Sequence, residues 1–148
     1  MTTGNIIDSS DLGLDPDSGR EKDLFRWFLA SFLFGKRIQQ GVARNAFDIL
    51  VKSGMDSPQK IVKAGWERLV EKLDEGGYVR YDESTARYLL ETSRLLEEKY
   101  HGRIREVFQR SSSEKDLRAR LQEFKGVGPK TVEIFLRDIH RPLRMIGR

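Results

Sequence analysis

A glycine-rich turn near residue 126 carries the residues best suited to chemistry. In residues 125–131, two glycines and a proline come directly before an amphipathic segment. Gly126 and Gly128 allow a positive φ and the close approach of another molecule, and Pro129 suits the first position of a helix. The amides at a helix N-terminus have no acceptor within the helix, and such amides bind phosphate. The order of these residues therefore predicts an anion-binding turn with two lysines beside it.

Two helices must position this turn. Leu117, Leu121 and Phe124 recur at helical spacing before it, and four apolar residues recur at i, i+3, i+4 and i+7 after it: Val132, Phe135, Leu136 and Ile139. Each spacing places the apolar side chains on one face of a helix. The pattern has two interpretations, an ordinary corner between two packed helices and a hairpin that binds phosphate.

The same helical periodicity runs through most of the chain. It predicts helices at about residues 20–35 and 41–53, a short helix from Ser57-Pro58 to Gly65, and further helices over residues 66–73, 82–100 and 104–108. No segment alternates in the manner of a strand, so we expect an all-α fold with one helical domain over residues 20–140. The first helix is rich in aromatic residues that could stack on bases, but their density favours a place in the core.

Composition and charge narrow the function classes. The 148 residues have a net charge of +4, yet residues 1–19 contain four acids (Asp8, Asp11, Asp15, Asp17) and no Lys or Arg, so the remainder carries +8. We therefore expect an acidic flexible tail over residues 1–19, in which Asp17 or Ser18 caps the first helix, and a basic tail over residues 141–148. A basic body suits a polyanion such as nucleic acid.

Several classes of site and location are not expected. The chain has no cysteine, which excludes disulfides and cysteine-held zinc or iron–sulfur sites, and its two histidines, His101 and His140, are not spaced as metal ligands. We expect no metal and no cofactor. The sequence shows neither an apolar run of membrane-spanning length nor a secretory signal, so we expect a cytoplasmic protein without membrane contact, nucleoid-associated if its source is prokaryotic.

Residues 124–131, FKGVGPKT, resemble the helix-hairpin-helix of the endonuclease III-like DNA glycosylase superfamily. The resemblance covers about residues 20–140, includes the Tyr-His-Gly end of the long helix at residues 100–102, and is weak before Trp66. It implies a helix-hairpin-helix near the C-terminus that binds duplex DNA, with the amides of Val127, Gly128 and Lys130 on one phosphate. The hairpin carbonyls can also hold a monovalent cation in DNA complexes of this family.

The resemblance implies a set of DNA-binding residues: Lys36, Arg37, Gln39, Gln40, Lys125, Gly126, Val127, Gly128, Lys130 and Thr131. In the family, polar residues between the first two helices enter the duplex where a base is flipped out. Gln39 and Gln40 match that junction only loosely, and exposed loop glutamines are the alternative interpretation.

The resemblance also implies catalysis by Lys130. In bifunctional members of the family, the lysine at this position attacks C1′ of a damaged nucleotide, and the resulting Schiff base leads to strand cleavage by β-elimination. This predicts a DNA glycosylase and abasic-site lyase of base excision repair, acting on damaged or abasic duplex DNA. A lysine that only contacts phosphate, or only solvent, is the alternative.

Two features depart from the family pattern, so the enzymatic activity stays open. The cluster-binding cysteines are missing, and residues 140–148 contain no acid where the family has its catalytic aspartate. The chain thus resembles a shortened member. Asp138 lies eight positions after Lys130, about two turns along the same helix, so an acid would have to come from Glu133, Asp23 or a partner chain. A DNA-binding module without catalysis and a helical protein-interaction domain remain alternatives, and the oligomeric state is open.

Overall fold

The computed structural model describes residues 7–148, and within them it contains eight α-helices, three short 3-10 helices and no strand. The α-helices are α1 (Glu21–Phe34), α2 (Gln40–Lys52), α3 (Pro58–Ala64), α4 (Trp66–Glu75), α5 (Asp82–Tyr100), α6 (Ile104–Arg110), α7 (Glu114–Leu121) and α8 (Pro129–Arg137). The 3-10 helices are η1 (Ser10–Leu12), η2 (Pro16–Ser18) and η3 (Arg141–Met145). The prediction of an all-α fold in one helical domain is confirmed.

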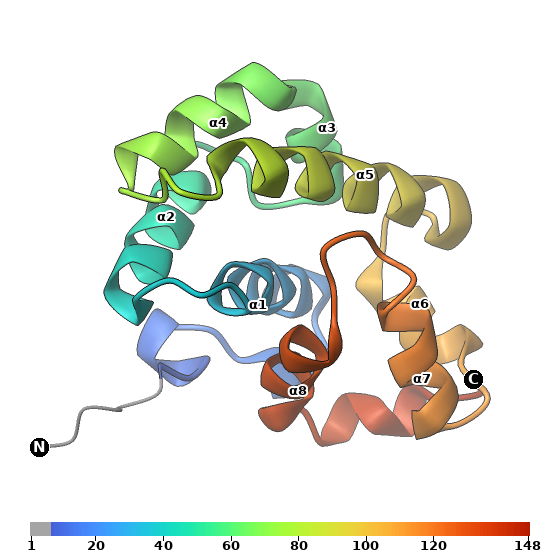
Figure 1. Cartoon of the computed structure of the whole chain (residues 1–148). Coiled ribbons are helices and arrows are strands. Elements are labelled where there is room, and N and C mark those ends of the chain that lie inside the picture. The colour runs from blue at the N-terminus through green and yellow to red at the C-terminus, as the bar shows by residue number, and fades with distance from the viewer. Residues whose placement is uncertain (1–6) are drawn as a thin grey trace, which may run out of the picture.

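Helix α1 lies at the centre of the molecule, between two groups of helices (Figure 1). One group consists of α2 to α5, which pack on one another, and α2 joins it to α1. The other consists of α6, α7, α8 and η3, and α6 and α8 both contact α1. All residues of α1 from Trp27 to Phe34 are buried. An apolar surface around most of a helix suits this central place.

Aromatic packing fixes the second group of helices on α1. The Phe28 ring lies 5.9 Å from that of Phe124 and 5.4 Å from that of Phe135, measured between centroids, and both pairs meet edge to face. The indole N–H of Trp27 donates to the carbonyl of Phe135 over 2.9 Å. These side chains are buried, so the alternative in which the aromatic residues of α1 stack on bases is wrong for Trp27 and Phe28.

Local capping follows the sequence in part. The Ser57 hydroxyl accepts from the Lys60 amide at the start of α3, as the Ser-Pro pair predicts. Trp66, Leu69, Val70 and Leu73 recur at helical spacing and predict one apolar stripe of α4, but Trp66 is 41% exposed. Its indole N–H donates to the carbonyl of Glu83. A residue at the first position of a helix can therefore turn its side chain out of the stripe.

The two ends of the chain differ from the predicted tails. Residues 7–19 lie against the helical body, with Pro16 buried, so a loose tail is wrong there; residues 1–6 fall outside the described part. Asp17 caps no helix at α1; its Oδ1 accepts from the amides of His140 and Arg141, each over 2.7 Å. The backbone N–H of Ser9 donates to Asp138. These hydrogen bonds attach the N-terminal segment to the C-terminal segment.

No helix between residues 7 and 148 combines the length and apolar character needed to cross a membrane.

Candidate functional site

The glycine loop, residues 122–128, joins α7 to α8 through a tight turn. Gly126 has a φ of 82°, a left-handed conformation that glycine adopts without steric cost. The Val127 amide donates to the Phe124 carbonyl over 3.1 Å and closes the turn. The hydroxyl of Thr92, on α5, donates to the Lys125 carbonyl over 3.1 Å. The loop is therefore held both by its own backbone and by the neighbouring helix.

Gly126 also lies directly against two aromatic residues. A Cβ atom there would lie 2.7 Å from Cζ of Phe32 and 3.0 Å from Cβ of Tyr88, closer than ordinary contact. The ammonium of Lys36 lies 5.9 Å from the ring centre of Phe32 and 5.4 Å from that of Tyr88, within cation–π range. The loop, α1 and α5 thus meet at one point, with the charge of Lys36 beside it.

Three backbone amides at the start of α8 have no acceptor within the described residues. They belong to Gly128, Lys130 and Thr131, whereas the Val127 amide is used inside the loop. The expectation that the Val127 amide also binds the phosphate is therefore wrong. A Cβ added at Gly128 would meet no atom within 4 Å, so the backbone at the start of α8 is open on that side. The arrangement can accept an anion at the positive end of α8.

Cations without acidic partners surround the loop. Lys125 and Lys130 are exposed and Lys36 is half-buried, and none of the three forms an ion pair within residues 7–148. Arg37 is exposed as well. Arg87 lies over Tyr88, with its guanidinium carbon 5.0 Å from the ring centre. These charges give the loop a basic surrounding that no carboxylate in the described part neutralises by direct pairing.

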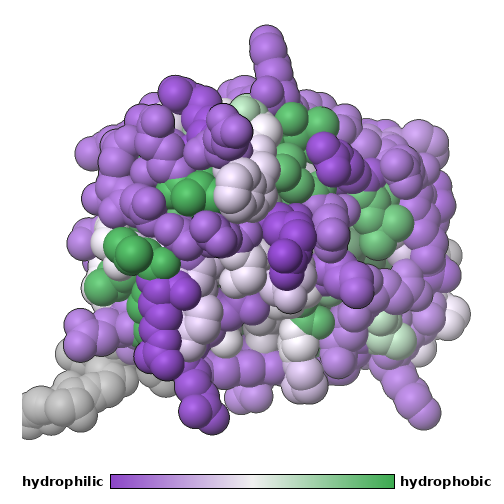
Figure 2. Space-filling model, turned by 45° about the horizontal axis from the view of Figure 1, so that its top comes forward, coloured by the Kyte–Doolittle hydropathy of each residue, from purple (hydrophilic) through white to green (hydrophobic). Residues whose placement is uncertain are grey.

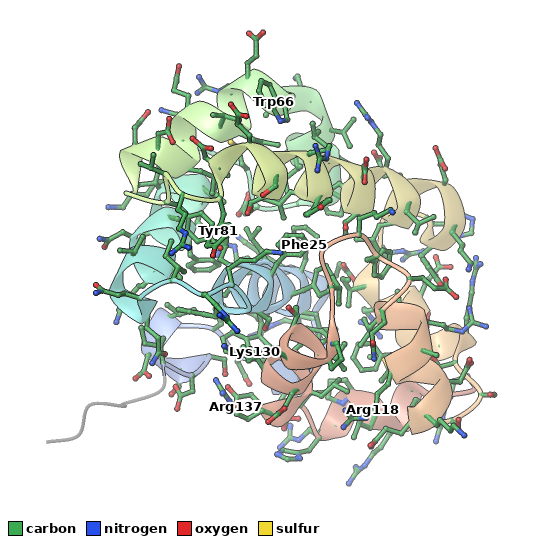
Figure 3. The ribbon with its side chains drawn as sticks, in the orientation of Figure 1. Phe25, Trp66, Tyr81, Arg118, Lys130 and Arg137 are labelled. Atoms are coloured by element: carbon green, nitrogen blue, oxygen red, sulfur yellow. The ribbon has the colours of Figure 1, made fainter. Side chains whose placement is uncertain are left out.

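A pocket of about 500 Å³ opens between α8 and the connection from α1 to α2. Its α8 side is formed by one helical face, and its other residues come from the α1–α2 region and the N-terminal segment: Lys130, Glu133, Ile134 and Arg137, then Phe34, Lys36, Ile38, Gln40 and Ile7. Figure 3 shows Lys130 and Arg137 on the side of α8 toward this connection. The structure thus brings the proposed nucleophile of α8 together with residues of the predicted α1–α2 junction.

The two glutamines predicted for that junction lie differently. Gln40 lines the pocket, and its side-chain oxygen accepts from the Ile7 amide over 2.7 Å. Gln39 is exposed, precedes α2 and does not line the pocket. Of the pair, only Gln40 shares a cavity with Lys130.

Thr131 does not offer its side chain to a ligand. It is 4% exposed, and a side chain at Gly35 would collide with its hydroxyl. The expectation that Thr131 contacts DNA is therefore wrong for the side chain, which instead packs α8 against the end of α1. The reason is the helical register, since Thr131 precedes the buried Val132 and lies on the same inner side of α8.

Of the three carboxylates considered as partners of Lys130, one lies in its pocket. Glu133 lines the pocket with Lys130. Asp138 accepts from Ser9 at the far end of α8. Asp23 pairs with Arg20 over 3.1 Å near the start of α1. At 1.5 Å per residue, Asp23 lies roughly 16 Å along α1 from its pocket end.

Sequence reasoning did not identify Arg137, Ile134 or Ile7 as part of this site. Positions three, four and seven after Lys130 fall on its face of α8, so the helical repeat could have found Ile134 and Arg137. Nothing local to Ile7 indicates that it lies beside α8, because that contact is made across most of the chain. The guanidinium of Arg137 donates to the Ile7 carbonyl over 3.1 Å.

Comparison with known proteins gives no assignment: no protein-family model matches the chain, and no curated protein matches it significantly.

Proposed function

We propose that the protein binds duplex DNA through the glycine loop and the first turn of α8, as a member of the endonuclease III-like DNA glycosylase superfamily. The observation that carries this proposal is the set of acceptor-free amides at Gly128, Lys130 and Thr131, with three lysines around them that form no ion pair with a described residue. Amides at a helix N-terminus bind phosphate oxygens without reading base sequence. Lys36, Lys125 and Lys130 add affinity that falls as salt rises.

The substrate class is duplex DNA with an abasic or damaged nucleotide, and Lys130 is the nucleophile. Its free amine adds to C1′ of the ring-opened sugar and water leaves, which yields an imine. The pocket beside Lys130 supports this role, because an extrahelical nucleotide needs a cavity next to the phosphate contact. A lysine that only contacted phosphate would need no such cavity.

A DNA-binding module without catalysis and a protein-interaction domain are the competing functions. The face drawn in Figure 2 is largely hydrophilic, and its hydrophobic groups are small and separated by polar side chains. Protein-binding sites more often present a continuous apolar patch. This face therefore offers a protein partner no continuous apolar patch. Covalent trapping separates the catalytic from the non-catalytic form.

Gly128→Glu is the variant that tests DNA binding. The φ of Gly128 is −107° and its Cβ direction is open, so a side chain fits without strain. The added carboxylate would stand where the phosphate binds. We expect affinity for a short duplex, measured by fluorescence anisotropy, to fall at least about 100-fold, because the carboxylate repels the phosphate and keeps it from the amides.

Ala119→Glu is the matched control, since Ala119 is an exposed residue of α7 and the substitution adds the same charge away from the loop. It should change affinity less than about threefold at physiological salt, where separated charges are screened. Equal affinity of Gly128→Glu and the unaltered protein, with both folded by circular dichroism, would contradict DNA binding through the loop.

A further inference from the structure

We propose that Glu133 removes the C2′ proton of the sugar that is bound to Lys130, and so drives strand cleavage. This inference rests on the proposed lyase function. The inference concerns β-elimination, the step that follows imine formation. The Lys130 amine alone is insufficient for this step, because β-elimination needs a proton acceptor beside the carbon next to the imine.

Glu133 is the one carboxylate among the described residues that line the Lys130 pocket. The other lining residues are apolar, basic or an amide, and none of these is a carboxylate base. Asp138 and Asp23, the other acids weighed for this role, are held elsewhere by Ser9 and Arg20. The lining of the pocket therefore identifies Glu133 as the candidate base.

Glu133 is also unengaged. Although Lys130 and Arg137 flank it at helical spacing, Glu133 forms no ion pair or hydrogen bond with any described residue. Arg137 instead donates to the Ile7 carbonyl, and its Nε lies 3.9 Å from Asp138. An exposed glutamate between two cations would ordinarily pair with one of them. The pairing of Arg137 with the N-terminal segment leaves the carboxylate available for a ligand.

The helical spacing of Lys130 and Glu133 allows them to act on adjacent atoms of one sugar, C1′ and C2′. Residues three apart on a helix have Cβ atoms about 5–6 Å apart on the same face. Lys130 would hold C1′ covalently, and C2′ is bonded to C1′. A carboxylate one turn further along α8 is therefore within side-chain reach of the C2′ proton while the imine exists.

The step balances without any further reactant. The Glu133 carboxylate takes the C2′ proton, and the C–H electron pair forms a C1′–C2′ double bond as the iminium nitrogen accepts electrons. That enamine then expels the 3′ phosphate: the nitrogen lone pair re-forms the C1′–N double bond, the C1′–C2′ double bond shifts to C2′–C3′, and the C3′–O bond breaks. The downstream strand leaves with a 5′ phosphate, and Glu133 releases its proton to solvent and is a carboxylate again. Water hydrolyses the conjugated imine and frees Lys130, replacing the water that was lost when the imine formed.

Glu133→Gln separates imine formation from elimination. Under single turnover on a duplex with one abasic site, two signals are followed: borohydride trapping, which reports the imine, and strand cleavage, which reports elimination. We expect Glu133→Gln to keep the trapped yield and to slow cleavage about 100-fold, the usual contribution of a positioned base. The variant removes a negative charge from the DNA-facing side, so weaker binding cannot explain slower cleavage.

Glu67→Gln is the matched control, because Glu67 is an exposed glutamate on α4 without a partner among the described residues. It should cleave like the unaltered protein. If Glu133→Gln cleaves at the unaltered rate, or if it loses trapping and cleavage together while folded, the inference about Glu133 is wrong. The proposed lyase function is tested separately, by the loss of trapping in Lys130→Ala. If the unaltered protein binds the duplex but never traps, the proposed lyase function fails and the inference falls with it.

Discussion

The two ends of α1 carry pockets of similar size and similar composition, but their charged groups are used differently. At the N-terminal end, a pocket of about 410 Å³ is lined by Glu21, Asp56 and Lys60, among others. Here Arg26 donates to Asp56 over 2.6 Å, Lys60 lies 3.5 Å from the same carboxylate, and Glu21 accepts from two amides of α6. At the C-terminal end, Lys36, Lys130 and Glu133 have no such partners in the described residues.

We propose that the pairing of the charged groups, and not the composition of the walls, separates the structural role of one pocket from the ligand-binding role of the other. Both cavities combine lysine, glutamate and aromatic or apolar walls. At the paired end, Glu21, Asp56 and Lys60 already have partners of the kind that a ligand would offer, so their contacts join α1 to the neighbouring segments. At the unpaired end, the charged side chains and the amides at the start of α8 can still bind a ligand. Substitutions at the paired end should therefore lower mainly the stability, and substitutions at the unpaired end should lower mainly DNA binding and cleavage.

Asp56→Ala should give the largest loss of stability. Asp56 is 8% exposed, and it joins α1 to α3 because Arg26 donates to it and Lys60 lies 3.5 Å from it. Its removal leaves the Arg26 guanidinium without its partner. We expect the free energy of unfolding, from urea denaturation, to fall by about 3 kcal/mol. DNA affinity of the folded variant should be unchanged, because the site lies at the other end of α1.

The Asp56 contribution should also depend on pH. Burial alone would raise the pKa of Asp56, but the hydrogen bond and charge of Arg26 outweigh it and hold that pKa below its ordinary value. A carboxyl whose folded pKa is depressed stabilises above its unfolded pKa, and this stability is lost as the pH falls below about 4. The gap between the unaltered protein and Asp56→Ala should narrow there. A gap that is constant from pH 7 to pH 3 would contradict the ion pair.

Gly126→Ala should lower the free energy of unfolding by less than Asp56→Ala does. It should affect the glycine loop through its packing, because Gly126 lies against Phe32. The positive φ and the close contact with Phe32 both oppose a side chain, and together they predict a loss of about 2 kcal/mol. Gly128→Ala, two residues on and in open space, should stay within about 0.5 kcal/mol. Equal thermal unfolding of the two variants would contradict the distinction between a glycine that seats the loop and one that faces a ligand.

The sequence was sufficient for features that depend on neighbours along the chain. Helical spacing predicted the existence and approximate limits of the helices, the Ser57-Pro58 start of α3, and the glycine turn before α8. Each of these is decided by residues within one or two turns of helix. For the same reason the burial of the aromatic residues of α1 was predictable, because a helix that is apolar on most of its surface must be covered.

The rest depends on contacts between distant residues, which one sequence does not encode in any local pattern. Asp17 was expected to cap α1 but accepts from amides 123 and 124 residues away. Thr131 was expected at the ligand surface, and only its packing against Gly35 shows that it is buried. The availability of Glu133 likewise follows from the contact of Arg137 with Ile7, which no spacing rule predicts.

The central claim is that Lys130, at the unpaired end of α1, forms a covalent imine with an abasic sugar. Its most direct test is borohydride trapping on a duplex with one abasic site, with Lys130→Ala and Lys60→Ala compared at equal concentration of folded protein. Lys60 is an exposed lysine that lines the other pocket, which makes it the matched control. We expect a covalent complex with the unaltered protein and with Lys60→Ala, and none with Lys130→Ala. Trapping that survives in Lys130→Ala, or fails in the unaltered protein while it binds the duplex, would contradict the claim.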